Sequence, residues 1–300
     1  MNSSVIKSII FRYPFIYWLA KPFIAIREGQ MKKKIEGKLK VIDTIIPLLY
    51  NDPLVRVDEF KGIFNIGAQS DLFRRLAIYG EYEPKLVKCC LEYLNRNKDV
   101  IDIGANIGFY SVLFAQEINK RVLAVEPTQN ALRRLRENIK LNNVESKVEI
   151  FEGVVSDHNG TLKIKSVVGK EEYSTIANPL HENIGQQQII EEEVVCITLD
   201  DLVEKYQLNP GFIKMDVEGA EMLVFKGAMK TLNKHRPIII SELTDELLRK
   251  NGSSAAEIIE LIVSAKYKVI DPLNASNTFK NQKFGDVLCI PLELLNTIAK

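Results

Sequence analysis

The sequence has few cysteines, few histidines and no long hydrophobic run. The scarcity of cysteine and the lack of a long hydrophobic run each exclude a class of protein. Its four cysteines among 300 residues include no CxxC pair, so neither a disulfide framework nor a thiolate metal site is expected, and a reducing compartment is favoured. The formal net charge of +1 provides no general attraction for nucleic acid. We therefore expect a cytoplasmic globular protein with no nucleic-acid partner and no bound metal.

The first 40 residues are both basic and apolar. They carry nine Lys or Arg against two Glu, an excess of 9 − 2 = 7 positive charges. The longest uninterrupted apolar run, Phe15 to Ala20, is shorter than a signal-peptide core of about 7 to 15 residues, and Pro14 and Pro22 would interrupt a membrane-spanning helix. Residues 1–40 are therefore expected either to bind a membrane surface peripherally or to pack as a helical lid on the following domain.

From residue 99 onward, short β-branched runs alternate with longer helical patterns. This alternation predicts a parallel sheet with helices on both of its faces. Two stretches, 161–168 and 191–199, depart from it and predict an antiparallel insertion. The remaining strands are expected at 100–103, 121–125, 148–155, 212–215, 238–241, 268–270 and 286–290, and the helices at 108–117, 129–142, 219–233 and 255–265.

These elements predict an α/β protein with a doubly wound, seven-stranded, Rossmann-like sheet and an N-terminal helical extension. The extension is placed at residues 1–75 and the sheet-containing domain at residues 76–300. Residues 35–95 are expected to be mainly helical, with Pro84 as the start of a helix.

The segment Val100 to Phe114 contains a glycine turn between the first strand of the sheet and its helix. Gly104 and Gly108 lie at the junction where doubly wound sheets place their ligand crevice. A dinucleotide-binding turn would read GxGxxG, whereas this one reads G-A-N-I-G, with Asp102 just before it and Asn106 within it. Two polar side chains, one of them anionic, occupy the space of a pyrophosphate, so a cationic or zwitterionic ligand is favoured.

A second acid follows at the end of the next strand. Glu126 lies 22 residues after Gly104 (126 − 104), where such folds place the acid that binds ribose hydroxyls. A ligand with a ribose and a positive group fits S-adenosylmethionine. Taken singly, the glycine spacing is also typical of packing between helices. An acid at this position is also typical of the solvent-exposed end of a strand.

Three acids gather where a later strand becomes a helix. Asp216, Glu218 and Glu221 follow the strand at 212–215. If the strand order reverses between this strand and the first one, Asp216 faces Asp102 across the crevice. Glu221 alone fits equally well as an acid that complements the helix dipole.

Five segments stand in a familiar order and spacing: DVIDIGANIGFYSVLFA, VLAVEPTQNALRRLRENIKLNN, ITLDDL, FIKMDVEGAEMLVFKGA and RPIIISEL. Together they resemble the FkbM-type family of S-adenosylmethionine-dependent methyltransferases, over about Tyr82 to Ile290. The resemblance implies a seven-stranded methyltransferase sheet and methylation of hydroxyl oxygens on sugars, polyketides or other small molecules.

The resemblance also implies roles for single residues. Glu126 would bind the ribose, Asp157 or its neighbours the adenine edge, and Glu221 would belong to the rim of the active site. The segment near Ser174 matches the family's substrate loop only loosely. The full set of implied cofactor-binding residues is Asp102, Gly104, Asn106, Gly108, Tyr110, Glu126, Pro127 and Asp157.

Methylation of a hydroxyl needs a group that removes its proton. Asp216 is the first candidate, because burial beside other carboxylates would raise its pKa; Glu218, Glu242 and His181 are weaker candidates. A divalent ion held near Asp216 is a less favoured alternative. The acceptor is expected to be a small molecule or glycan. Two other classes stay open: a nicotinamide-dependent dehydrogenase, and a non-catalytic protein that binds a nucleoside or docks on a membrane.

Overall fold

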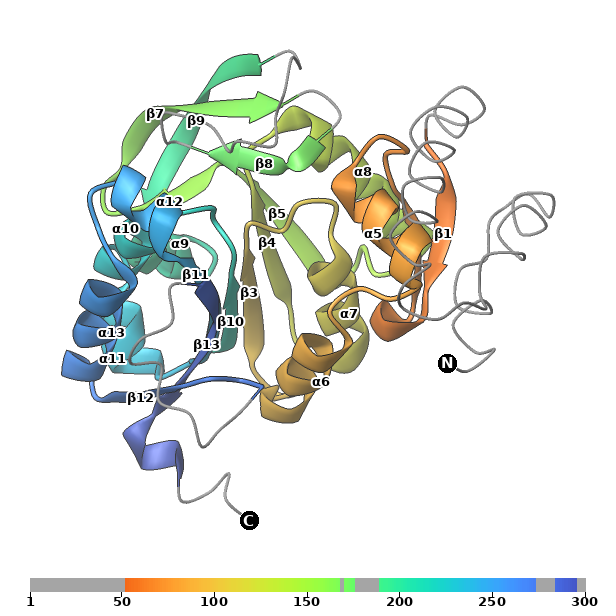
Figure 1. The fold of residues 1–300 in the computed structure, drawn as a ribbon. Coiled ribbons are helices and arrows are strands. Elements are labelled where there is room, and N and C mark those ends of the chain that lie inside the picture. The colour runs from red at the N-terminus through yellow and green to blue at the C-terminus, as the bar shows by residue number, and fades with distance from the viewer. Residues whose placement is uncertain (1–51, 168–169, 176–188, 274–283, 296–300) are drawn as a thin grey trace, which may run out of the picture.

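A seven-stranded sheet with the order β12-β13-β11-β10-β3-β4-β5 forms the centre of the protein (Figure 1). The computed structural model describes residues 52–167, 170–175, 189–273 and 284–295. Strand β13 pairs antiparallel with both of its neighbours, β12 and β11. The other strand pairs of this sheet are parallel. The strands are β3 (Asp99–Ile103), β4 (Val122–Glu126), β5 (Val148–Glu152), β10 (Pro210–Met215), β11 (Ile238–Thr244), β12 (Tyr267–Ile270) and β13 (Phe284–Pro291). The predicted doubly wound α/β fold is thereby confirmed.

Helices cover both faces of this sheet because its strands are apolar on both sides. Alternate residues of β3 illustrate this: Val100 packs in one core and Ile101 in the other. One face is covered by α6 (Pro84–Tyr93), α7 (Phe109–Glu117) and α8 (Gln129–Leu141). The opposite face is covered by α9 (Leu199–Lys205), α10 (Glu221–Lys226), α11 (Met229–His235), α12 (Asp245–Lys250) and α13 (Ala255–Ser264).

Within the described residues 52–83, the segment before α6 contains two strands as well as a helix, so there the expectation of a mainly helical segment at residues 35–95 is corrected. It forms an antiparallel hairpin of β1 (Leu54–Val57) and β2 (Gly62–Asn65), followed by α5 (Asp71–Tyr79). Lys61, just before β2, adopts a left-handed φ of 52°. In β1 the buried Val55 and Val57 flank the exposed Arg56, as the alternation of a strand predicts. The boundary predicted between residues 75 and 76 falls inside α5; residues 1–51 lie outside the described part.

Aromatic rings join this hairpin to the large sheet's first helix. Phe109 of α7 lies 4.8 Å from Phe60 and 4.4 Å from Phe64, measured between ring centroids. These rings belong to the same buried cluster as Val100 and Phe212 of the large sheet. The described part of the N-terminal segment therefore shares the core of the domain.

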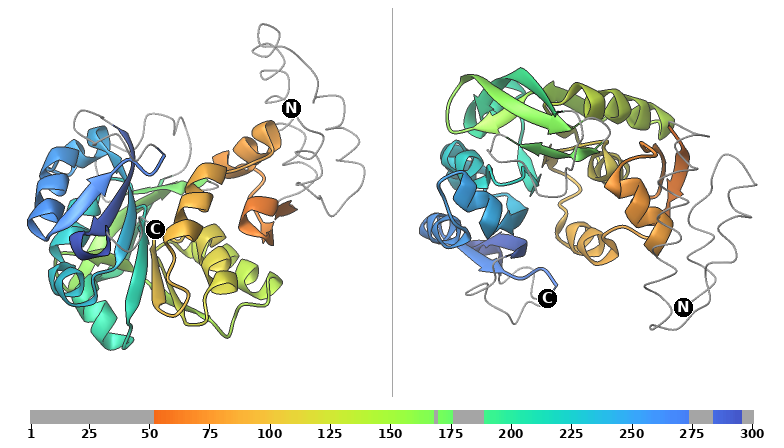
Figure 2. Two further views of the ribbon diagram at one scale, coloured as in Figure 1. Left: turned by 90° about the horizontal axis from the view of Figure 1, so that it is seen from below. Right: turned by 45° about the horizontal axis from the view of Figure 1, so that its top comes forward.

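The antiparallel insertion forms a second sheet with the order β6-β9-β7-β8. It overhangs the carboxyl ends of the large sheet, as the right view of Figure 2 shows. The single strand predicted at 148–155 is wrong, because Gly153 separates β5 from a strand that pairs with the insertion instead. The strands are β6 (Val154–Ser156), β7 (Gly160–Val167), β8 (Lys170–Thr175) and β9 (Ile189–Thr198).

The helix predicted at 219–233 is also divided in the structure. Helix α10 ends before Gly227, and α11 starts at Met229. A Cβ atom on Gly227 would lie 2.1 Å from the backbone oxygen of Ser156, so only glycine allows the helix to approach β6 this closely. In the described ranges, none of the helices combines the length and apolar character that crossing a membrane requires.

A buried amide ties α8 to two other segments, and its removal should destabilise the fold. Asn138 is fully buried; its Oδ1 accepts from the Asn65 amide at 2.6 Å, and its Nδ2 donates to the carbonyls of Asn65 and Ile107. We expect Asn138→Ala to lower the free energy of unfolding by about 3 kcal/mol, since it leaves buried backbone groups without partners. Exposed Asn233→Ala should change it by less than about 0.5 kcal/mol. Urea unfolding measures both, and equal losses would contradict the prediction.

Candidate active site

A cavity of about 1190 Å³ opens at the carboxyl ends of β3, β4, β10 and β11. Strands β3 and β10 are neighbours there although they are far apart in the chain, so the cavity lies at the point where the strand order reverses. Its walls include Tyr82, Leu162 and Ile164, from the segment before α6 and from β7. Of the residues predicted from the sequence, those that line it are Asp102, Gly104, Asn106, Tyr110, Glu126, Pro127, Asp216, Glu218 and Glu242.

The glycine turn after β3 has the backbone that its sequence predicts. Gly104, Asn106 and Gly108 have φ angles of 81°, 48° and 91°, in the left-handed region that glycine and asparagine tolerate best. A Cβ atom on Gly104 would lie 1.8 Å from the backbone oxygen of Asp216. Gly108 begins α7 beside Leu135 and does not line the cavity.

Asp102 presents a buried carboxylate to the cavity. The residue is 1% exposed, and its Oδ2 accepts from the Ser111 hydroxyl at 2.6 Å. Its Oδ1 is buried and has no hydrogen-bond partner among the residues that the structure describes. Burial raises the pKa of Asp102. A cationic ligand group such as an ammonium would supply the missing partner, which fits the amino acid part of S-adenosylmethionine.

Glu126 is held in one orientation by three hydrogen bonds. Its Oε1 accepts from the Thr128 amide at 2.9 Å and the Thr128 hydroxyl at 2.7 Å, and its Oε2 accepts from the Asn106 amide at 3.0 Å. Burial raises the pKa of Glu126 to about 7. A fixed carboxylate at the end of β4 has the geometry and acceptor capacity to bind ribose hydroxyls.

Lys214 is a buried cation that sequence reasoning did not assign to the site. Its Nζ lies 3.3 Å from Asp216 Oδ2 and 4.7 Å from the ring centroid of Tyr110. Burial alone would lower its pKa, but the carboxylates of Asp216, Asp102 and Glu83 outweigh that effect and raise it. A charged residue within the apolar strand FIKM was the signal that could have identified it.

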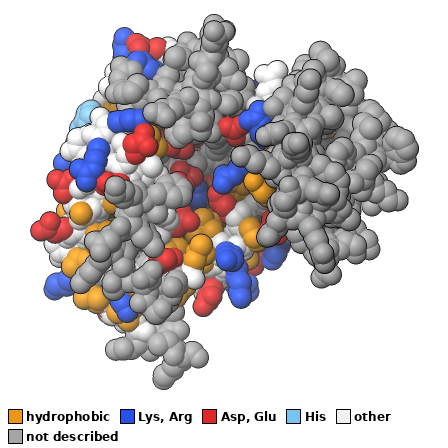
Figure 3. Space-filling view, in the orientation of Figure 1, with side chains coloured by type: hydrophobic (Ala, Val, Ile, Leu, Met, Phe, Trp, Pro, Cys, Tyr) orange, Lys and Arg blue, Asp and Glu red, His pale blue; other side chains and the backbone are white. Residues whose placement is uncertain are grey.

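Acidic side chains line the half of the cavity beyond Lys214. On the face drawn in Figure 3, acidic and basic side chains lie together near the centre. Two of the lining acids, Glu83 and Asp286, were missed because they lie before α6 and in β13, far from the family motifs. Burial is the largest cause, and the charge of Asp216 the second largest, of the rise in the pKa of Glu242 to about 8. Burial, followed by the charges of Glu83 and Asp216, raises the pKa of Asp286 to about 7.

Two sequence expectations about the acids do not match this geometry. Asp216 was expected to be buried, but 37% of its side chain is exposed and Lys214 neutralises its charge. Asp157 does not line the cavity; its carboxylate contacts His158 at 2.7 Å, which lowers its pKa, and its neighbour Ser156 lines the wall instead.

Three further residues lie away from the cavity or from the described part. Glu221 is 2% exposed and does not line the cavity; its Oε1 accepts from the Gly219 amide at 3.2 Å. His181 lies outside the described residues, and so does the side chain of Ser174. Glu218 does line the cavity, with a left-handed φ of 48°.

Fold and site together define the class of the protein, an S-adenosylmethionine-dependent methyltransferase with a Rossmann-like sheet. The family model "Methyltransferase FkbM domain" matches residues 102–269, which is more than half of the chain, so the chain belongs to the FkbM methyltransferase family. Family membership confirms S-adenosylmethionine as the cofactor and decides against the dehydrogenase and the non-catalytic alternatives.

Individual relatives are distant. The chain is 24% identical to hexuronic acid methyltransferase AglP of Haloferax volcanii, over 62% of this chain and 72% of the relative. It is 28% identical to 2-O-methyltransferase NoeI of Sinorhizobium fredii, over 55% of this chain and 71% of the relative. A solved FkbM methyltransferase from Methylobacillus flagellatus has a TM-score of 0.43 at 16% identity, over 72% of this chain and 52% of that chain, so this chain spans about half of that protein.

A glycine pair tests whether the close approach of β3 and β10 shapes the cofactor site. Gly104→Ala places a methyl group against the Asp216 carbonyl, whereas Gly252→Ala, at a similar φ of 76°, meets nothing within 4 Å. We expect Gly252→Ala to cost about 1–2 kcal/mol of unfolding free energy and to bind S-adenosylhomocysteine normally. Gly104→Ala should cost more and lose binding. Equal behaviour of the two variants in calorimetry and urea unfolding would contradict the role of the close approach.

Glu221 should make stability depend on pH. Burial raises its pKa from 4.5 to about 7, so between these values the folded state keeps a proton that the unfolded state has released. The free energy of unfolding therefore falls as pH rises from about 5 to 7. Glu221→Gln removes this loss, and we expect it to gain about 2–3 kcal/mol relative to the parent protein between pH 5 and 8. Exposed Glu204→Gln is the control; a gain independent of pH would contradict the prediction.

Proposed function

We propose that this methyltransferase transfers the methyl group to a hydroxyl oxygen of a sugar, a glycan or another small molecule. The observation that carries the proposal is the acidic half of the cavity, where Glu83, Asp216, Glu242 and Asp286 line the space next to the cofactor residues. A hydroxyl is a weak nucleophile and reacts faster when a carboxylate accepts its proton. Carboxylates also accept hydrogen bonds from several hydroxyls at once, which suits a polyol such as a sugar.

The chain's own residues divide the work between binding and chemistry. S-adenosylmethionine supplies an activated methyl group, so the protein mainly aligns the reactants and excludes water. Asp102 would hold the amino acid part of the cofactor and Glu126 its ribose, while the Asn106 amide of the glycine turn donates to Glu126 and fixes that carboxylate. A carboxylate of the acidic half takes the hydroxyl proton; Asp216, Glu218 and Glu242 are the candidates from the sequence.

The names of the relatives support this class of acceptor. AglP is a hexuronic acid methyltransferase, and NoeI is a 2-O-methyltransferase. Both names fit transfer to hydroxyl-bearing molecules, and neither identifies the acceptor here. The walls that would contact an acceptor come from α5 and β7, with Ile78, Leu162 and Ile164 among the lining residues. Because these elements lie outside the cofactor turn, we propose that they determine acceptor choice.

No nucleic acid is needed for this function. Contact of residues 1–40 with a membrane surface stays a prediction, since those residues lie outside the described part of the chain. A peripheral position would suit an acceptor attached to a lipid, and a free sugar would not require it.

An acceptor screen tests the proposal, with a matched pair of variants to establish the cofactor site. The probes are methyl glycosides of neutral sugars, hexuronic acids and amino sugars, incubated with S-adenosylmethionine; mass spectrometry detects the gain of one methylene mass, and fragmentation assigns it to a hydroxyl, a carboxylate or an amino nitrogen. We expect methylation of a hydroxyl in at least one class. Methylation of amino nitrogens alone, or of none of these acceptors, would contradict the proposal.

Glu126→Gln should weaken S-adenosylhomocysteine binding about 10- to 100-fold, because hydrogen bonds to a charged group contribute roughly 1.5–3 kcal/mol. Glu152→Gln is the control, since Glu152 is the register partner of Glu126 on β5 but is exposed and lies outside the cavity. Calorimetry measures both affinities. Equal affinities would contradict the ribose-binding role of Glu126.

A further inference from the structure

Five charged side chains project from one face of the large sheet at its carboxyl edge. Side chains alternate between faces along a strand, and register partners share a face. Lys214 is the partner of both Asp102 and Ile240, and Glu242 is the partner of Asp286. Since Asp216 and Glu242 each lie two residues beyond such a position, all of them share this face: Asp102, Lys214, Asp216, Glu242 and Asp286.

The one cation in this row, Lys214, forms its ion pair with Asp216 of the same strand end. Lys214 pairs with Asp216 at 3.3 Å and lies over the ring of Tyr110. In the described ranges, neither Glu242 nor Asp286 forms an ion pair with a cation, and the Thr244 hydroxyl reaches Glu242 only at 3.4 Å. Glu242 and Asp286 therefore face each other without a counter-ion that belongs to this part of the chain.

Two carboxylates directly opposite on antiparallel strands repel each other unless they share a proton. Their Cβ atoms are about 4.5–5.5 Å apart in such pairs. Neighbouring charges also act on the two pKa values. The negative charges of Glu83 and Asp216 raise the pKa of both acids, and that of Asp271 further raises the pKa of Asp286. The positive charge of Lys214 lowers both pKa values in part. Burial and these acids raise the pKa of Glu242 to about 8 and that of Asp286 to about 7, so the pair exchanges a proton near neutral pH.

We propose that the Glu242–Asp286 pair, and not Asp216, accepts the proton of the acceptor hydroxyl. The inference rests on the proposed methylation of a hydroxyl. In the step, the hydroxyl oxygen bonds to the methyl carbon, the carbon–sulfur bond breaks, and the sulfur keeps the electron pair. The hydroxyl proton passes to a carboxylate of the pair. Asp216, held by Lys214, positions the acceptor.

Binding of the cationic cofactor beside a buried polar atom on the same face would prepare the pair to accept a proton. Asp102 Oδ1 has no hydrogen-bond partner in the described part of the chain although the residue is 1% exposed, which points to a cationic ligand in this row of side chains. The donor carries a sulfonium in addition to its ammonium. A positive charge within a few ångströms lowers a carboxyl pKa by about 1–3 units, so donor binding should remove the shared proton before the acceptor reacts.

Proton release on cofactor binding tests this without knowledge of the acceptor. S-adenosylmethionine and S-adenosylhomocysteine make the same ammonium and ribose contacts, but only the first carries a sulfonium. The difference in proton release between the two ligands therefore contains no contribution from Asp102 or Glu126. Calorimetry in buffers of different ionisation enthalpy should show that S-adenosylmethionine releases about half a proton more near pH 7.5. Equal release by the two ligands would overturn the proposal.

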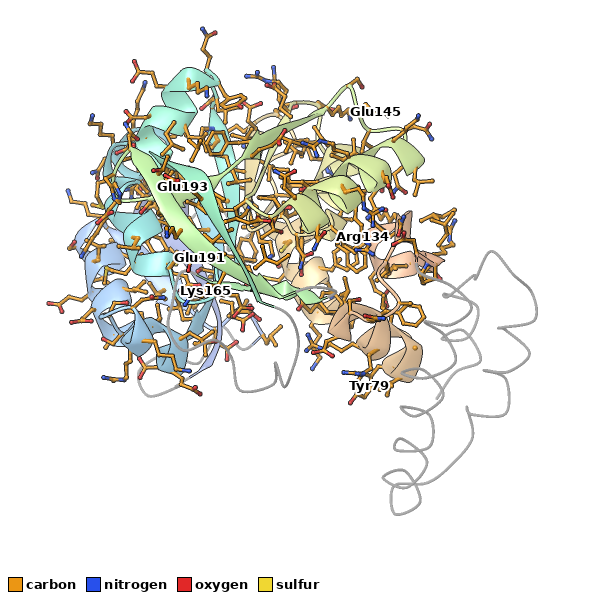
Figure 4. All side chains as sticks on the ribbon, turned by 90° about the horizontal axis from the view of Figure 1, so that it is seen from above. Tyr79, Arg134, Glu145, Lys165, Glu191 and Glu193 are labelled. Atoms are coloured by element: carbon orange, nitrogen blue, oxygen red, sulfur yellow. The ribbon has the colours of Figure 1, made fainter. Side chains whose placement is uncertain are left out.

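Variants assign the proton to its residues. We expect Glu242→Gln/Asp286→Asn to abolish the extra release at every pH while keeping the affinity for S-adenosylhomocysteine. Asp216→Asn should keep the release and move its midpoint to lower pH, since Asp216 raises the pKa of both acids. Glu145→Gln is the control, because this exposed residue lies at the outer edge of the molecule in Figure 4.

Two outcomes of these variants would overturn the proposal. One is undiminished release by the double variant, and the other is loss of the extra release at every pH in the single variant Asp216→Asn. The proposed function has a separate test, since an acceptor panel without any methylated hydroxyl would contradict it and leave the proton release unchanged. Failure of the inference and failure of the proposed function are therefore distinguishable.

Discussion

The close approach of β3 and β10 at their carboxyl ends is the constraint on which the site depends. The Asp216 amide donates to the Ile103 carbonyl at 2.9 Å, and Gly104 leaves no room for a side chain against the Asp216 carbonyl. This contact holds the cofactor turn beside the strand that carries Lys214 and Asp216. It also brings Asp102 level with Lys214 in the sheet, so the donor-binding and acceptor-binding halves of the cavity share one wall.

Charge is distributed unevenly along that wall. Lys214, the one buried lysine among the residues that the structure describes, pairs with Asp216, whereas Glu242 and Asp286 lie outside this ion pair and have raised pKa values. Two carboxyl groups of similar chemistry thereby acquire different tasks, because burial and neighbouring charge differ over a few residues. The insertion and α5 complete the walls of the cavity: β7 contributes the apolar Leu162 and Ile164, and α5 contributes both apolar and charged side chains.

Much of the fold could be predicted because its signals are local. The alternation of β-branched runs with helical patterns was sufficient for the seven strands and most of the helices, and the glycine turn indicated the ligand edge. The errors arose where a distant segment overrides the local pattern. Gly153 and Gly227 end their elements because β6, β9 and α10 meet there, and the hairpin at 54–65 has a pattern too short to be distinguished from a helix.

By itself, the sequence determined the family, the cofactor and the acids at the carboxyl ends of β3, β4 and β10, because each of these depends on residues close together in the chain. Only the tertiary structure decided that Asp216 is partly exposed and paired with Lys214, that Asp157 contacts His158 and does not line the cavity, and that Glu83 and Asp286 belong to the site. Burial and charge at a side chain are set by neighbours from other elements. β13 reaches β11 only after the chain has crossed the whole sheet, so no local pattern could place Asp286 opposite Glu242.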